Sequence, residues 1–317
     1  MADHPRTRHV ALVGPTAAGK SAIAMRVARE RGGVELVTVD SMQVYRGMDI
    51  GTAKPTLHEQ AEVPHHLLDL VDPAEEFTVA EWQRAARVAI GGIEARGNVA
   101  LLVGGTGLYL RSVTDDLDIP DRYPEVRAAI EEELAGAGPE ALHGRLAALD
   151  PLAASRMEPS NTRRVVRALE VTLGSGRLFS DFGPGLEAHP PSPIAQVGVA
   201  VEPAELAERI AARYEHQLAA GFLEEVAALA DRRLHPLGLS RTAAQALGYK
   251  ELLAHLDGAC SLDEAVDLAV RRTRQFARRQ RTWFRRDPRI RWCTPDEAAD
   301  VLFELLDGPI RPAPAAD

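Results

Sequence analysis

The sequence predicts an α/β fold in which a parallel sheet is flanked by helices and carries an inserted all-helical domain. Three observations support this class. Short apolar runs alternate with helical patterns near both ends of the chain, as in sheets built from strand–helix–strand units. The first run leads directly into a glycine-containing loop at 14–19. Strand signals then vanish between about 121 and 193, where only helical patterns remain.

The first apolar run, at 10–13, ends in a loop that opens a helix. Gly14, Gly19, Lys20 and Ser21 fit the phosphate-loop pattern G-x-x-x-x-G-K-[ST]. In this pattern backbone N–H groups and the lysine bind phosphate oxygens, the hydroxyl lies near Mg²⁺, and the helix N-terminus favours the same anion. The predicted diphosphate site comprises Gly14, Pro15, Thr16, Ala17, Ala18, Gly19, Lys20 and Ser21. The core is therefore expected to be P-loop NTPase-like; a plain glycine turn is the alternative.

Polar residues follow the next two predicted strands, at 34–40 and 99–103. In open α/β sheets ligands bind beyond the carboxyl ends of strands, which places Asp40 at the mouth of the phosphate site. The later strand ends in Gly104-Gly105-Thr106-Gly107, where two glycines allow a ligand to approach the backbone and leave Thr106 exposed. Thr106 could equally cap the following helix, and the two roles are compatible.

The rest of the core is expected to be mainly helical. Thr78 and Glu81 form a capping box for a helix at 78–96. A strand is expected at 195–201 and a short one at 289–293. Helices are expected at 203–221, 222–233, 243–256, 261–285 and 295–306, and a disordered tail at 308–317. The polar, glycine-broken segment 45–55 is interpreted as a substrate-shaping loop. A metal pair at His65-His66 is disfavoured because adjacent residues on an extended chain point opposite ways.

The predicted insertion, 121–193, divides a core made of 1–120 and 194–317. Its helices are expected at 124–135, 139–149 and 161–173. The third carries Arg163, Arg164 and Arg167 on one face. This cationic face is a candidate RNA contact.

Composition limits the class of protein. No apolar run approaches the roughly 20 residues of a membrane span, and two distant cysteines indicate neither a disulfide framework nor a zinc site. A cytoplasmic location without membrane contact is expected. The net charge of −9 argues against a general nucleic-acid binder, yet ten arginines and one acid lie between Arg271 and Arg291. That run is either a solvated helix face or a surface for a polyanion.

Seven segments together resemble one family. They are 14–21, DSMQVYRGMDIGTAKP at 40–55, PHHLLD at 64–69, GGTGLY at 104–109, RRVVRALE at 163–170, GF at 221–222 and GYKE at 248–251. In this order they are similar to the bacterial tRNA dimethylallyltransferases, also called tRNA isopentenyltransferases (IPP transferase family). The resemblance implies transfer of a dimethylallyl group from dimethylallyl diphosphate to N6 of adenosine 37, next to the anticodon of tRNAs that read codons beginning with U.

The resemblance also implies roles for individual residues. Lys20, Arg213 and Mg²⁺ near Ser21 would neutralise the leaving diphosphate, Asp40 would act as the base, and Thr106 would hydrogen-bond the bridging oxygen. The target base would leave the anticodon-loop stack. Contacts with the tRNA anticodon stem-loop are implied at Asp40, Ser41, Met42, Gln43, Arg127, Arg163, Arg164, Val165, Val166, Arg167 and Lys250. A monomer is expected.

Two other enzyme classes share the phosphate loop. An isopentenyltransferase acting on free adenine nucleotides would have little need of the inserted arginines. A P-loop small-molecule kinase would consume a nucleoside triphosphate. A non-catalytic RNA-binding module would leave Lys20, Asp40 and Thr106 without a purpose.

Overall fold

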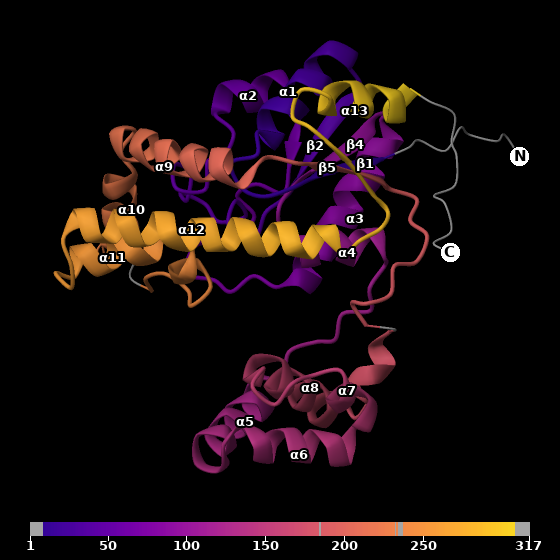
Figure 1. Ribbon diagram of the computed structural model, residues 1–317, viewed down its shortest axis with the longest axis vertical. Coiled ribbons are helices and arrows are strands. Elements are labelled where there is room, and N and C mark those ends of the chain that lie inside the picture. The colour runs from indigo at the N-terminus through magenta and orange to yellow at the C-terminus, as the bar shows by residue number, and fades with distance from the viewer. Residues whose placement is uncertain (1–8, 184, 232, 234–236, 308–317) are drawn as a thin grey trace, which may run out of the picture. The chain divides into compact units, whose positions relative to one another are not determined.

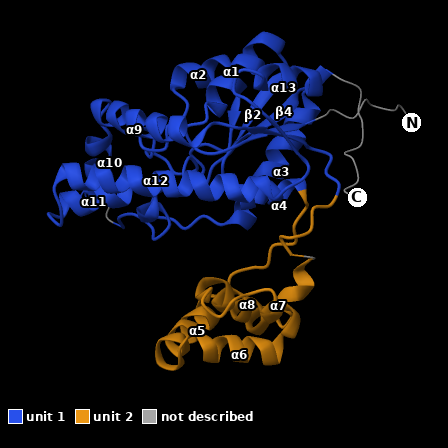
Figure 2. Ribbon diagram, viewed as in Figure 1, with its two compact units in different colours: residues 1–114, 191–317 blue, residues 115–190 orange. Residues whose placement is uncertain are grey.

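The structure, a computed structural model, describes residues 9–183, 185–231, 233 and 237–307. The chain divides into two compact units, coloured separately in Figure 2. Unit 1 contains Met1–Thr114 and Pro191–Asp317, and unit 2 contains Asp115–Pro190. Sequence analysis placed the insertion at 121–193. The predicted tail at 308–317 lies outside the described residues.

A six-stranded sheet with the order β3-β2-β4-β1-β5-β6 forms the centre of unit 1, and each neighbouring pair is parallel. Its strands are β1 (Val10–Val13), β2 (Val34–Val39), β3 (His65–His66), β4 (Val99–Gly104), β5 (Ala195–Val199) and β6 (Ile290–Cys293). The residues of β1 are at most 1% exposed, as expected for an apolar strand covered on both faces. The predicted α/β class is confirmed. The carboxyl ends of β1, β2 and β4 meet at one edge, which brings Gly14, Asp40 and Gly105 together.

Helices cover both faces of the sheet. Figure 1 shows α1 and α13 on one face and α3 and α4 on the other. The helices of unit 1 are α1 (Lys20–Arg31), α2 (Leu57–Glu62), α3 (Val79–Ala95), α4 (Gly107–Thr114), α9 (Pro203–Ala219), α10 (Phe222–Ala230), α11 (Tyr249–Leu256), α12 (Leu262–Arg285) and α13 (Ala298–Asp307). The predicted capping box of α3 is present, with Thr78 accepting from the Glu81 N–H.

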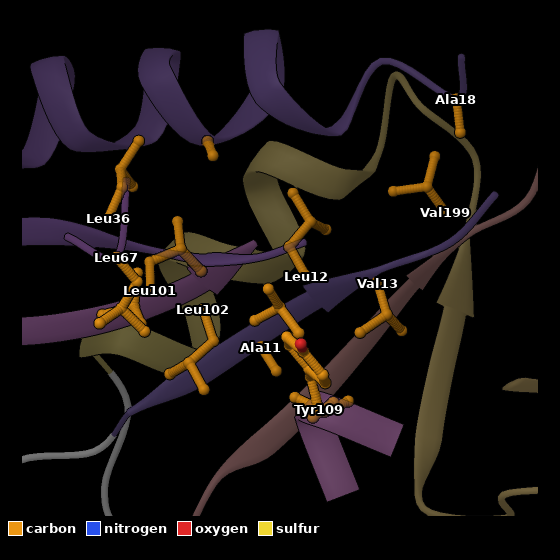
Figure 3. Packing of buried hydrophobic residues seen from close by; sticks show 14 of the residues in the cluster. Ala11, Leu12, Val13, Ala18, Leu36, Leu67, Leu101, Leu102, Tyr109 and Val199 are labelled. Atoms are coloured by element: carbon orange, nitrogen blue, oxygen red, sulfur yellow. The ribbon is translucent and has the colours of Figure 1, made fainter. Parts of the chain in front are cut away.

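Apolar side chains from the central strands form the core beneath the site. Leu12 and Val13 of β1 pack with Leu101 and Leu102 of β4 and with Tyr109 of α4 (Figure 3). The Tyr109 ring also contacts the fully buried Trp82 of α3, with ring centroids 4.9 Å apart. This packing holds the strand ends that carry the polar residues.

Unit 2 is all-helical. It contains α5 (Pro124–Ala137), α6 (Pro139–Leu149), α7 (Pro151–Ser155), α8 (Thr162–Ser175) and a 3₁₀ turn at Phe179–Phe182. Its buried residues form a cluster of their own, to which α8 contributes Val165, Val166 and Leu169. Unit 2 therefore has a separate hydrophobic core.

The structure corrects several expected elements. The helix expected at 243–256 is broken into a 3₁₀ turn at Ala243–Gln245 and α11, because Gly248 adopts a φ of +87° between them. The helix α2 and the strand β3 were not predicted. The histidines of β3 are engaged separately: His66 Nε2 lies 2.6 Å from a Glu35 carboxylate oxygen, and His65 Nδ1 lies 2.7 Å from the Val63 carbonyl.

The described residues contain neither a cluster of metal-ligating side chains nor a membrane-spanning helix. No group of three or more His, Cys, Asp or Glu side chains there is arranged to hold a metal ion. Within the same residues, no helix is both long and apolar enough to cross a membrane.

Candidate active site

The phosphate loop closes tightly between β1 and α1. Gly14 has a φ of +149°, and a Cβ atom there would lie 3.0 Å from the Val199 carbonyl oxygen. Ala17 adopts a φ of +63°, a left-handed conformation that is uncommon for residues other than glycine and concentrates at functional sites. Gly19, at +87°, is the N-cap of α1. The loop therefore precedes a helix N-terminus, the arrangement that binds phosphate.

Lys20 is the cation of this loop. Its Nζ donates to the Pro15 carbonyl at 2.7 Å. Burial lowers the pKa of Lys20 to about 8, the negative charge of Asp40 opposes this shift, and the positive charge of Arg213 adds to it. These three charged groups are therefore close enough to act on one another.

Arg213 reaches the loop from α9. Its Nη1 donates to Thr16 Oγ1 at 3.0 Å, and its Nη2 donates to the Gly51 carbonyl at 3.3 Å. Burial lowers the pKa of Arg213, but a guanidinium remains protonated in proteins. The structure thus places a fixed positive charge beside the phosphate loop.

Asp40 and Thr106 lie at the neighbouring strand ends. Asp40 Oδ1 accepts from the Met42 N–H at 2.8 Å and from the Gln43 N–H at 3.4 Å. Thr106 Oγ1 accepts from the Ser41 N–H at 3.3 Å. The segment after β2 is therefore bound to the segment after β4, with the carboxylate and the hydroxyl at one edge of the sheet.

Two cavities adjoin these residues. The first, about 520 Å³, is lined by loop residues 16–21 and the second, about 290 Å³, by Ser41, Met42, Thr106 and Tyr249 among others. Both volumes are of the order of small-molecule sites. The residues that line both are Thr16, Asp40, Thr52, Arg213, Phe276 and Gln280. An anion bound in the first cavity and a second substrate bound in the second cavity would both contact the Asp40 carboxylate and the Arg213 guanidinium.

Glu225 of α10 holds the loop 45–55. Its carboxylate accepts from the N–H groups of three consecutive residues, 49–51, at 2.9, 2.7 and 3.2 Å, and from the Tyr249 hydroxyl at 2.6 Å. Gln217 Nε2 donates to the Ile50 carbonyl at 2.6 Å. Sequence analysis missed both side chains. The sequence around a carboxylate on an amphipathic helix does not indicate which distant backbone groups that carboxylate binds.

The predicted RNA contacts in unit 1 are partly engaged within the protein. Gln43 Nε2 donates to the carbonyls of Thr52 and Ala53 at 3.0 and 3.1 Å. Ser41 and Met42 are half-buried in the second cavity. Lys250, an exposed residue of α11, donates through its Nζ to Gln245 Oε1 at 2.8 Å.

The predicted RNA face of unit 2 is smaller than expected. The side chains of Val165 and Val166 are 1% and 2% exposed and pack in the core of unit 2, so any RNA contact at these positions would be made by the backbone. Arg127 and Arg167 both form ion pairs with the buried Glu170, at 3.0 and 2.8 Å. The exposed Arg163 and the half-exposed Arg164 complete the predicted face.

The arginine run of 271–291 is also divided. Some of its members bind the protein itself: Arg272 pairs with Glu251, Arg274 donates to the Ala207 carbonyl, Arg289 pairs with Asp287, and Arg291 pairs with Glu304. Others are exposed: Arg271, Arg278, Arg279, Arg285 and Arg286. The run is therefore partly a set of internal ion pairs and partly a cationic surface.

The glycines after β4 make room for the protein's own side chains. A Cβ atom on Gly105 would lie 2.2 Å from Gln280 Nε2, and one on Gly107 would lie 2.1 Å from Trp283 Nε1. The side chains of α12 therefore pack against this backbone, and Gly104 and Gly105 also line the first cavity. Gln280 was not predicted, although the buried stripe of α12 passes through it.

Three comparisons relate the chain to known proteins. Residues 43–287 match the family model described as IPP transferase, and residues 7–69 match one described as isopentenyl transferase. A tRNA dimethylallyltransferase of Streptomyces coelicolor is 51% identical over 96% of this chain and 98% of its own length. One of Geobacter metallireducens is 48% identical over 97% of this chain and 99% of its own.

The chain is also similar to solved structures. The tRNA isopentenylpyrophosphate transferase of Bacillus halodurans has a TM-score of 0.67 and is 37% identical, over 95% of this chain and 97% of that chain. A eukaryotic dimethylallyltransferase acting on tRNA has a TM-score of 0.75 at 24% identity, over 94% of this chain and 78% of that one. At that identity the second comparison supports the fold alone.

Proposed function

The chain belongs to the IPP transferase family, and from this premise we propose that it transfers a dimethylallyl group to tRNA. The donor is dimethylallyl diphosphate, and the acceptor is N6 of adenosine 37, directly 3′ of the anticodon in tRNAs that read codons beginning with U. The observation that most supports the proposal is that Asp40 and Arg213 line both cavities, one at the phosphate loop and one beside Thr106.

On the donor side, the bond between the allylic carbon and the diphosphate oxygen breaks, and the electron pair leaves with the diphosphate. The loop N–H groups, Lys20 and Arg213 stabilise the negative charge that develops there. Arg213 is held by Thr16 and Gly51, so it needs little reorganisation when the bond breaks. Thr106 donates its hydroxyl hydrogen to the bridging oxygen.

On the acceptor side, N6 forms the new bond to the allylic carbon and loses a proton. Asp40 accepts this proton, because its carboxylate lines the second cavity as well as the first. The products are N6-dimethylallyladenosine and diphosphate, so atoms and charge balance without a nucleoside triphosphate. The adenine must leave the stack of the anticodon loop to enter a protein cavity.

The donor set fits Mg²⁺. Ser21 offers a hydroxyl at the start of α1, in the cavity that the phosphate loop lines. Mg²⁺ usually takes one or two protein oxygens and completes its shell with phosphate oxygens and water. Bound there with the diphosphate, the ion would supply additional positive charge to the leaving group.

The exposed arginines of α8 and α12 are proposed to contact the phosphates of the anticodon stem-loop, which fixes its orientation. Arg163 and Arg164 provide this contact in unit 2. A tRNA substrate makes the cytoplasm the proposed location, and the enzyme is proposed to act as a monomer, which light scattering in solution would test.

One incubation separates this function from its rivals. The protein is given labelled dimethylallyl diphosphate with total tRNA, with AMP, or with neither, and ATP consumption is followed in parallel. Label in tRNA at the adenosine after the anticodon is expected. Label in AMP alone would establish the free-nucleotide enzyme, and ATP consumption without label transfer would establish a kinase. The names of the relatives favour tRNA over both alternatives.

A further inference from the structure

Gln280 joins the phosphate loop to the segment after β4, which carries Thr106. It lies on α12 and is 7% exposed. Its Oε1 accepts from the Thr16 N–H at 2.9 Å, and its Nε2 donates to the Gly105 carbonyl at 2.9 Å. Both distances are typical of well-formed N–H···O hydrogen bonds. One side-chain amide therefore bridges the phosphate loop and the segment after β4.

The bridge restrains functional groups on both sides. On the donor side, Thr16 also accepts from Arg213 through its hydroxyl. On the other side, Gly105 directly precedes Thr106, which accepts from the Ser41 N–H beside Asp40. The amide of Gln280 thus adds a side-chain link between the phosphate loop and the residue before Thr106 to the pairing of β1 with β4.

The local packing is specific for this contact. A side chain at position 105 would collide with Gln280 Nε2, so α12 can approach the loop only because that residue is glycine. Gln280 also lines both cavities, although its two amide atoms are already engaged with the protein. These observations favour an internal role for the amide.

We propose that Gln280 is a positioning residue that holds the phosphate loop and Thr106 at the separation required for group transfer. The inference rests on the function proposed above. Its effect is expected on kcat, because a displacement of about 1 Å in a reacting geometry can cost about 10²-fold in rate. The Thr106 hydrogen bond strengthens as charge develops on the bridging oxygen, so binding of each substrate alone should change little.

The first test is Gln280→Met, which keeps the length of the side chain and removes both hydrogen bonds. With labelled dimethylallyl diphosphate and tRNA, kcat is expected to fall by about 10- to 100-fold, with each KM within about threefold of wild type. Gln275→Met is the matched control, because Gln275 is an exposed glutamine on the same helix. An unchanged kcat, or a raised KM for tRNA with normal kcat, would overturn the proposal; the latter result would make Gln280 an RNA contact.

The second test is Gln280→Glu. A protonated carboxyl can accept from the Thr16 N–H and donate to the Gly105 carbonyl, whereas an ionised carboxylate cannot donate. Burial beside a carbonyl raises the pKa of such a carboxyl. The ratio of the variant kcat to the wild-type kcat is therefore expected to rise severalfold as the pH falls from about 8 to 6. A ratio that stays flat, as expected for Gln275→Glu, would exclude the bridge as the cause.

A third measurement does not depend on activity. Hydrogen exchange at the Thr16 amide is expected to be at least about tenfold faster in Gln280→Met than in wild type, because the acceptor is lost. If wild-type protein failed to modify tRNA, the proposed function would fail while this exchange result still tested the bridge. Equal protection in both proteins would show that Gln280 does not hold the loop.

Discussion

The pKa of Lys20 makes diphosphate binding sensitive to pH in a predictable way. Burial lowers this pKa to about 8, so in the free protein about nine-tenths of Lys20 is protonated at pH 7 and about one-tenth at pH 9. A bound diphosphate favours the charged lysine. The contribution of Lys20 to the affinity for dimethylallyl diphosphate is therefore expected to be constant below pH 7 and to fall about tenfold between pH 7 and pH 9.

Calorimetric titration of wild type and Lys20→Arg from pH 6.5 to 9.5 would measure this effect. Arginine does not lose its proton in this range, so the variant reports the titration of the ligand itself and of all other groups. The difference between the two proteins isolates Lys20. Identical pH profiles would refute the assignment of Lys20 as the titrating contact to the diphosphate. Lys20→Ala should in addition lower turnover by several orders of magnitude at pH 7.

The remaining predictions concern other parts of the proposed mechanism. Asp40→Asn should lower kcat by about 10²- to 10⁴-fold and leave dimethylallyl diphosphate affinity unchanged; a normal kcat would remove Asp40 as the base. Glu225→Gln should destabilise the protein by about 1–3 kcal/mol in denaturant unfolding, because an amide oxygen cannot replace a carboxylate that accepts four hydrogen bonds. Replacing Arg163 and Arg164 by alanine should raise KM for tRNA without changing dimethylallyl diphosphate binding, and equal loss of both would indicate damage to unit 2. Affinity for tRNA should fall with salt with a log–log slope of roughly −3.5 to −6 for five to eight arginine contacts, and a slope near zero would mean that shape and stacking hold the RNA.

The fold could be predicted in large part because its signals are local. The apolar strand β1, the phosphate loop and the capping box at Thr78 each depend on a few neighbouring residues. The two-residue β3 was missed because so short a strand has no periodicity. The break before α11 was missed because it depends on the backbone conformation of Gly248, which its neighbours in sequence do not reveal.

The residues of the candidate site could be predicted only where a local sequence motif marks them. Lys20 and Asp40 stand at recognisable strand ends. Glu225 and Gln280 act on backbone groups that lie far away in sequence, so no local pattern marks them. The charge pattern did not reveal that Arg167 is also engaged within the protein, because the helical spacing that places it on a cationic face also places Glu170 within reach.

The separate core of unit 2 has a consequence for how the sheet is assembled. The central strand β1 is made first, yet its neighbours are β4 and β5, and all of unit 2 lies between those two strands in the chain. Pairings so distant in sequence form slowly, because loop closure costs entropy that grows with the length of flexible chain. Within unit 2, Arg167 donates to the Pro120 carbonyl at 2.7 Å, and Arg177 lies 3.5 Å from Asp118, so its first and last segments are held together. If unit 2 folds during synthesis, the flexible chain between β4 and β5 is shorter when β5 pairs with β1. The apolar β1 is then exposed without its neighbouring strands for a shorter time.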